Sequence, residues 1–127
     1  MDDAIKEMLR HLPPNVVNQL DFTPESLRVV EAWLLATFPD IETLLKRENA
    51  MILDGIARYV GETFRENLGG EWILETEDPK MAHYSLPSLK LSGNRRATLT
   101  PATLVTTTVH RRKGDFLLSV FEAYKRD

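Results

Sequence analysis

Two glutamates in one helical stretch have the spacing of paired acid/base carboxylates. Glu62 and Glu66 stand four residues apart, which places both side chains on one face of a helix. Two carboxylates in that arrangement can serve general acid/base chemistry. Arg58 and Arg65 lie beside them, however, and Asp54 precedes Arg58 by four residues. Opposite charges at this spacing form ion pairs, so the pattern favours a solvated ion-pair face and predicts no catalytic residue.

The histidines and serines add no catalytic or metal-binding pattern. His11, His83 and His110 are far apart in the sequence, and none belongs to a pair at helical spacing. No serine lies in G-x-S-x-G, no glycine-rich phosphate loop occurs, and the chain has no cysteine. The sequence therefore predicts a protein without catalytic residues, metal or cofactor, and not an enzyme.

The basic residues gather in two short clusters near the C-terminus. Arg95-Arg96 is the first and Arg111-Arg112-Lys113 is the second. Arginine forks suit phosphate or carboxylate groups. No aromatic side chains that stack on bases are interleaved with these clusters, so nucleic-acid binding is the alternative function and not the first.

The net charge of −3 hides an asymmetry between the two parts of the chain. Residues 1–79 carry 16 acidic and 7 basic side chains, whereas residues 80–127 carry 3 acidic and 9 basic ones. We interpret the two parts as complementary within one fold. An acidic helical surface would also suit a basic protein partner, such as a nuclease toxin.

Length and composition indicate one domain of ordinary globular character. A chain of 127 residues with 43% hydrophobic and 28% charged residues can bury a core without disulfides. The N-terminus is acidic and lacks the apolar region of a signal peptide. No apolar run approaches the roughly 20 residues that span a bilayer. We therefore expect a cytoplasmic protein with no membrane association.

The first half of the chain has helical periodicity. Pro13-Pro14 ends the first helix, and Thr23 with Pro24 has the pattern of an N-cap followed by a proline at the first helical position. Asp40 is the expected cap of the next helix. Gly55 and Gly61 lie inside the last helix, where glycine indicates close approach by another backbone. The expected helices cover residues 3–12, 23–38 and 41–68, the last with an interruption near 47–49.

A glycine stop separates these helices from a short sheet. Gly69 is expected to have a positive φ in a left-handed or Schellman helix ending. Strands are expected at residues 72–76, 81–86 and 89–91. Because they are few and close in sequence, they predict an antiparallel meander.

The C-terminal region allows two interpretations before the last helix. Thr100-Pro101 favours a helix over residues 101–111, but the β-branched run at 103–109 is also compatible with a strand. Asp115 is the expected cap of a final helix. The prediction is a single α+β domain over residues 1–127, with N-terminal helices packed on a small antiparallel sheet and a C-terminal helix or helices.

One segment resembles a known kind of protein. The sequence YVGETFR, followed after two residues by LGGEW, occupies positions 59–72. It resembles a helix–Gly-Gly-x-Trp segment of small uncharacterised bacterial domains, some of which are grouped with immunity-protein-like families of toxin systems. The resemblance covers about 14 residues. It implies a bacterial α+β domain that binds another protein, and it supplies no catalytic residue.

These observations predict a non-enzymatic protein-binding module of bacterial origin, with an immunity-like role. Nucleic-acid binding through the basic C-terminal third, or a small enzyme without a recognisable motif, is the alternative. Trp72 is interpreted either as an interface anchor or as a core tryptophan at the start of a strand. The identity of the partner and the oligomeric state stay open. The candidate partner-binding residues are Arg58, Glu62, Glu66, Trp72, Arg95, Arg96, Arg111 and Arg112.

Overall fold

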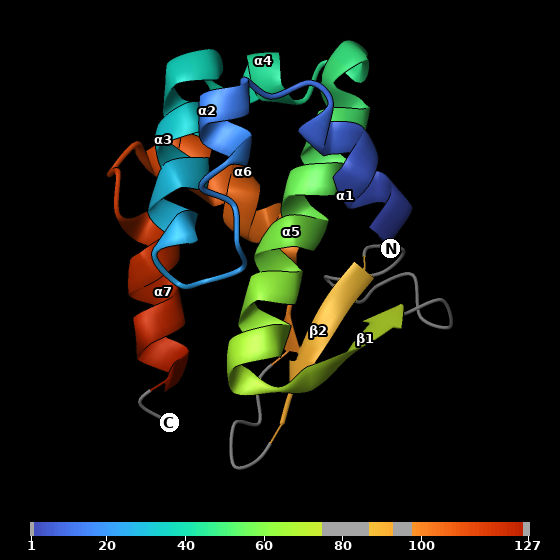
Figure 1. Ribbon diagram of the computed structural model, residues 1–127. Coiled ribbons are helices and arrows are strands. Elements are labelled where there is room, and N and C mark those ends of the chain that lie inside the picture. Colours follow the sequence, from blue (N-terminus) through green and yellow to red (C-terminus); the bar gives the residue numbers. More distant parts are fainter. Residues whose placement is uncertain (1, 75–86, 93–97, 126–127) are drawn as a thin grey trace.

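A computed structural model describes residues 2–74, 87–92 and 98–125, and its helices surround one long central helix (Figure 1). The helices, strands and one short 3-10 turn follow in the order α1 (Asp2–Leu9), α2 (Pro14–Val17), α3 (Ser26–Thr37), α4 (Ile41–Leu44), η1 (Arg47–Asn49), α5 (Ala50–Leu68), β1 (Gly70–Leu74), β2 (Pro87–Leu91), β3 (Thr98–Leu99), α6 (Pro101–Arg111) and α7 (Phe116–Lys125). Helices at both ends of the chain and a small antiparallel sheet confirm the α+β prediction.

Helix α5 is the organising element of the fold. It contacts α1, α6 and β2, and in Figure 1 it runs between the sheet and the pair α3 and α7. Its apolar stripe, including Ile56, Val60 and Phe64, is buried. The Phe64 ring meets the Phe121 ring of α7 edge to face, with centroids 5.3 Å apart. The core therefore lies along the inner side of α5.

The sheet is an antiparallel meander in the order β1-β2-β3. Gly70 pairs with Leu91, and Trp72 pairs with Leu89. The strand expected at 72–76 thus begins two residues earlier, and the strand expected at 89–91 begins at Pro87. The strand expected at 81–86 lies outside the described residues. The short strand β3 was not expected from the sequence.

Two of the local signals for helix boundaries agree with the structure, and a third does not. Residues 101–111 form α6 with Pro101 in its first turn, so the helical interpretation of this stretch is confirmed. The Asp40 carboxylate accepts the Thr43 N–H at 2.8 Å and caps α4 as expected. The expected N-cap at Thr23, with Pro24 at the first helical position, is wrong, because α3 begins at Ser26. Thr23 instead lies in a turn in which its N–H and hydroxyl both donate to the Asp21 carboxylate.

Gly69 ends α5 with the predicted positive φ of 80°. Its ψ of 163° differs from the expected left-handed ending, because that ending requires ψ near about 45°. This combination of angles is essentially restricted to glycine. The chain therefore turns directly from α5 into the extended conformation of β1.

Two long-range polar contacts join α3 to the turn between α6 and α7. The Glu31 carboxylate of α3 is fully buried and accepts the backbone N–H groups of Phe116 and Leu117 at 3.1 and 2.8 Å. Arg112 donates to the carbonyl oxygens of Phe38 and Leu35, at 2.8 and 2.6 Å, at the end of α3. Glu31 therefore accepts the first N–H groups of α7, at the helix terminus where the sequence predicted Asp115 as the cap.

Candidate functional site

The outer face of α5 carries two ion pairs. Arg58 Nε lies 3.1 Å from Asp54 Oδ1, and Arg65 Nε lies 2.8 Å from Glu62 Oε1. The pairs span four and three residues, as the sequence predicts for alternating charges on one helix face. The side chain of Glu62 is only 14% exposed, whereas that of Asp54 is 49% exposed. The two pairs therefore occupy different environments, one at the surface and one partly inside.

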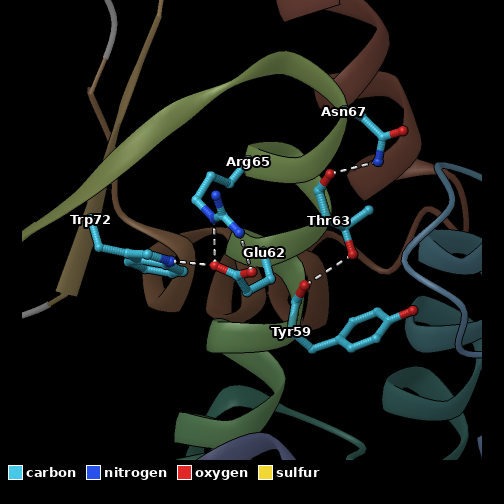
Figure 2. Close-up of polar contacts among 6 residues, drawn as sticks. All are labelled: Tyr59, Glu62, Thr63, Arg65, Asn67 and Trp72. Carbon is cyan, nitrogen blue, oxygen red and sulfur yellow. Dashed lines mark hydrogen bonds and ion pairs between the residues drawn. The ribbon is translucent and has the colours of Figure 1, made fainter. Parts of the chain in front are cut away.

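Trp72 of β1 completes the inner pair. Its indole Nε1 donates to Glu62 Oε1 at 2.6 Å, and Figure 2 shows Trp72 and Arg65 converging on this carboxylate from different sides. Trp72 is half-buried, so it is neither a fully enclosed core residue nor a freely exposed one. Both interpretations of Trp72 therefore apply in part. The indole packs on α5 as a core tryptophan would, and part of it still reaches the surface as an interface anchor would.

Gly61 provides the space in which the indole lies. A Cβ at this position would overlap Trp72 Cη2 and lie 2.6 Å from Trp72 Cζ2 and 3.0 Å from Pro101 Cγ. The close approach expected at Gly61 is confirmed, but the side chains of Trp72 and Pro101 make it and not another backbone. At Gly55 the backbone does approach, since a Cβ there would lie 2.8 Å from the carbonyl oxygen of Ala4.

The hydrogen bonds to Glu62 also affect its protonation. The hydrogen bond from Arg65 is the main cause that holds the pKa of Glu62 below its ordinary value of 4.5. The indole N–H of Trp72 lowers the pKa further, and partial burial opposes both effects. Glu62 is therefore a carboxylate at neutral pH and acts as a hydrogen-bond acceptor, not as an acid.

A small apolar cavity lies beside Trp72, between the first half of α5, the start of α6 and the end of the sheet. Its volume is 180 Å³, and the Asp54–Arg58 ion pair forms part of its lining. The cavity is lined by Ala50, Leu53, Asp54, Ala57, Arg58, Trp72, Pro87, Pro101 and Ala102. The lining combines a tryptophan and two prolines with one ion pair. A mostly apolar lining with few polar groups is typical of a binding pocket for an apolar group.

The opposite side of α5 carries a polar cluster with a structural role. The hydroxyl of the buried Tyr59 accepts the Phe22 N–H at 3.0 Å and lies 2.8 Å from the Ser26 hydroxyl. Burial raises the pKa of Tyr59 above 10.0. Asn67 donates to the carbonyl oxygen of Thr63 at 2.7 Å (Figure 2), and also to that of Phe22 at 2.9 Å. These bonds hold the segment before α3 against α5.

The structure brings together only part of the predicted partner-binding set. Arg58 and Trp72 line the cavity, and Glu62 contacts Trp72. Glu66 is exposed further along α5. The remaining residues are distant or undescribed: Arg111 lies over the Phe116 ring at 5.4 Å, Arg112 binds the end of α3, and Arg95 and Arg96 lie outside the described residues.

Sequence reasoning missed most of the cavity lining. Ala57 and Ala102 have no distinctive chemistry, and Pro101 was interpreted only as a helix start. Gly61 was the one available signal, because a glycine inside a helix indicates that something packs closely against it. Its sequence position does not identify Trp72 or Pro101 as the neighbour.

The described residues contain neither a metal-binding cluster nor a helix that could span a membrane. Among residues 2–74, 87–92 and 98–125, no group of three or more histidine, aspartate or glutamate side chains is placed to bind a metal ion. Over the same residues, no helix has the length and apolar character needed to cross a membrane.

The comparisons with known proteins identify no relative. No family model matches this chain, no curated protein matches it, and no solved structure matches it. The resemblance of positions 59–72 to immunity-like bacterial domains therefore stays a prediction. The geometry around Trp72 is the main basis for a functional proposal.

Proposed function

We propose that this protein is a protein-binding module that receives one ring-sized apolar side chain of its partner in the cavity beside Trp72. The observation that carries the proposal is the apolar 180 Å³ cavity with Trp72 as one wall and the Asp54–Arg58 ion pair in its lining. The proposal keeps the non-enzymatic binding role predicted from the sequence and gives it a location.

The volume of the cavity supports an anchor of limited size. An apolar cavity of about 150 Å³ holds one benzene molecule. The cavity here is slightly larger, so it suits a phenyl or leucyl group and is too small for a typical cofactor. Burying such a side chain contributes roughly 1.5–3 kcal/mol to association.

The residue types around the cavity support a protein partner. Tryptophan and arginine are enriched among the residues that dominate binding energy at protein interfaces, and a polar rim usually surrounds them. Trp72 is half-buried, and the Arg58 side chain is 24% exposed in its pair with Asp54. The ion pair can therefore contact polar groups of the partner around an apolar anchor.

The geometry gives less support to nucleic-acid binding. Arg112 is engaged with two carbonyl oxygens at the end of α3, and Arg111 lies over a phenyl ring. Phosphate contacts require cations that face the ligand. Within the described part of the chain, Arg111 and Arg112 therefore contribute to the packing of α3, α6 and α7.

A blocking substitution tests the proposal. Ala102 lines the cavity and is only partly buried, so Ala102→Phe should fill the space with a ring. Ala123→Phe is the matched control, because Ala123 is exposed on α7 and does not line the cavity. Proteins captured from the native host by the wild-type chain, and identified by quantitative mass spectrometry, should be retained by the control and lost by Ala102→Phe.

The outcome is interpretable once both variants are shown to melt within a few degrees of the wild type. Equal capture by Ala102→Phe and the wild type would contradict the proposal. Absence of any reproducible partner of the wild type would contradict it as well.

A further inference from the structure

We propose that Glu62 is a positioning residue, which holds the Trp72 indole as a wall of the cavity and thereby sets the affinity of the cavity for an apolar group. The inference rests on the proposed function, because it assumes that the cavity binds a ligand. It assigns Glu62 an indirect role in place of the direct partner contact predicted from the sequence.

The carboxylate of Glu62 is itself held in one orientation. Arg65 Nε donates to Oε1 at 2.8 Å, and Arg65 Nη2 donates to Oε2 at 3.0 Å. A bidentate pair of this kind fixes the plane of the carboxylate as well as its distance. Oε1 then presents its remaining lone pair to Trp72 Nε1 at 2.6 Å, as Figure 2 shows.

Packing alone does not determine the direction of the indole. The ring lies over Gly61 and beside Pro101, and both contacts are apolar. Apolar contacts favour burial of the ring but have little directional preference. The hydrogen bond to Glu62 is directional, so it determines which edge of the ring faces α5 and which part lines the cavity.

The low exposure of Glu62 makes this hydrogen bond difficult to replace. With 14% of the Glu62 side chain exposed, water has limited access to the acceptor position. Removing the carboxylate leaves the indole N–H without its partner, and the ring must move to reach water. The cavity wall would then lose its fixed position, which weakens ligand binding by loss of preorganisation.

Two substitutions separate the acceptor from the charge. Glu62→Ala removes the acceptor, whereas Glu62→Gln keeps an amide oxygen that can accept from the indole but has no ion pair with Arg65. Glu66→Ala is the matched control, because Glu66 is exposed one turn further along α5. All variants are made in a Trp33→Phe background, which leaves Trp72 as the single tryptophan of a chain that has two.

The binding measurement uses benzene as the probe. Benzene is titrated into isotope-labelled protein, and the methyl resonances of Ala57 and Ala102 report occupancy of the cavity. The Nε1–H resonance of Trp72 and its fluorescence emission report the position of the indole. We expect Glu62→Ala to weaken benzene binding about tenfold and to shift both Trp72 signals. Glu62→Gln should lie between Glu62→Ala and the wild type, and Glu66→Ala should match the wild type.

Failure of the positioning role can be distinguished from failure of the proposed function. Unchanged benzene affinity and unchanged Trp72 signals in Glu62→Ala would overturn the positioning role, while the Ala102→Phe result would still decide the proposed function. Benzene binding to the wild type without shifts at Ala57 and Ala102 would also overturn the inference, as would no benzene binding at all. If Glu62→Ala does not fold, Glu62→Gln decides the inference: an intermediate loss of benzene affinity with shifted Trp72 signals supports the positioning role, and wild-type values overturn it.

Discussion

The Glu31 carboxylate accepts the backbone N–H of Leu117 at 2.8 Å, although 86 residues separate the two in the sequence. The same carboxylate accepts the N–H of Phe116, and the Glu31 side chain is fully buried. The first N–H groups of a helix have no partner inside the helix and need an acceptor. A side chain of α3 thus provides the cap of α7 and fixes how the two helices dock.

Removal of this cap should destabilise the protein strongly. Glu31→Ala leaves two N–H groups without their acceptor in a buried site, so we expect a loss of about 2–4 kcal/mol in the free energy of unfolding. Glu25→Ala, at an exposed position before α3, should change it by less than about 0.5 kcal/mol. Urea unfolding followed by circular dichroism measures both. A loss below about 1 kcal/mol for Glu31→Ala would show that water replaces the carboxylate.

The side chain of Arg112 should stabilise the fold, whereas its left-handed backbone conformation should destabilise it. It has a left-handed conformation, with φ 53° and ψ 42°, while its guanidinium binds two carbonyl oxygens of α3. Arg112→Ala should cost about 1–2 kcal/mol. Arg112→Gly should cost less than Arg112→Ala, because glycine adopts this conformation without strain. Chemical denaturation of both variants tests the order, and the reverse order would contradict it.

The effect of Gly61→Ala on the free energy of unfolding should change sign when Trp72 is replaced by alanine. In the wild type, Gly61→Ala places a Cβ against Trp72 and should cost about 1–3 kcal/mol. In a Trp72→Ala background the main obstacle is absent, and Gly61→Ala should stabilise by about 0.5–1 kcal/mol through helix propensity. A double-mutant cycle by thermal unfolding measures the coupling. Equal costs in both backgrounds would show that Trp72 is not the contact that matters.

The ion pair of Glu62 should make stability depend on pH in a defined window. The pKa of Glu62 is lower in the folded protein than its ordinary value of 4.5, so its contribution is complete above pH 4.5 and is lost as the pH falls through the folded pKa. The stability difference between the wild type and Glu62→Gln should therefore be constant near pH 7 and shrink below about pH 4.5. Urea titrations from pH 7 to pH 3 test this, and a difference that grows on acidification would contradict it.

Nucleic-acid binding should be weak and nonspecific. The net charge of the chain is −3, and Arg112 is engaged within the fold. Electrophoretic shift assays with DNA and RNA at physiological salt should show no sub-micromolar complex. A tight, salt-sensitive complex that Arg111→Ser weakens would instead place the C-terminal cluster at a phosphate-binding surface.

Local sequence signals determined much of the fold. Pro101 in the first turn of α6, Asp40 as the cap of α4 and Gly69 as the end of α5 each depend on neighbours within about four residues. Helix periodicity and caps act over this range, so the sequence alone predicts them. The two ion pairs on α5 were predictable for the same reason, because i,i+3 and i,i+4 neighbours meet on any helix.

The candidate site was decided only by the tertiary structure. Glu62 was recognisable as a helix-surface carboxylate, but its contact with Trp72 depends on how β1 returns along α5. The cavity arises where α5, α6 and the sheet meet without filling the space, and no sequence pattern indicates that residues of these elements line one cavity. Likewise, nothing near Glu31 in the sequence indicates that it caps a helix 85 residues later. Local propensity acts within a few residues, whereas packing between elements determines which distant groups meet.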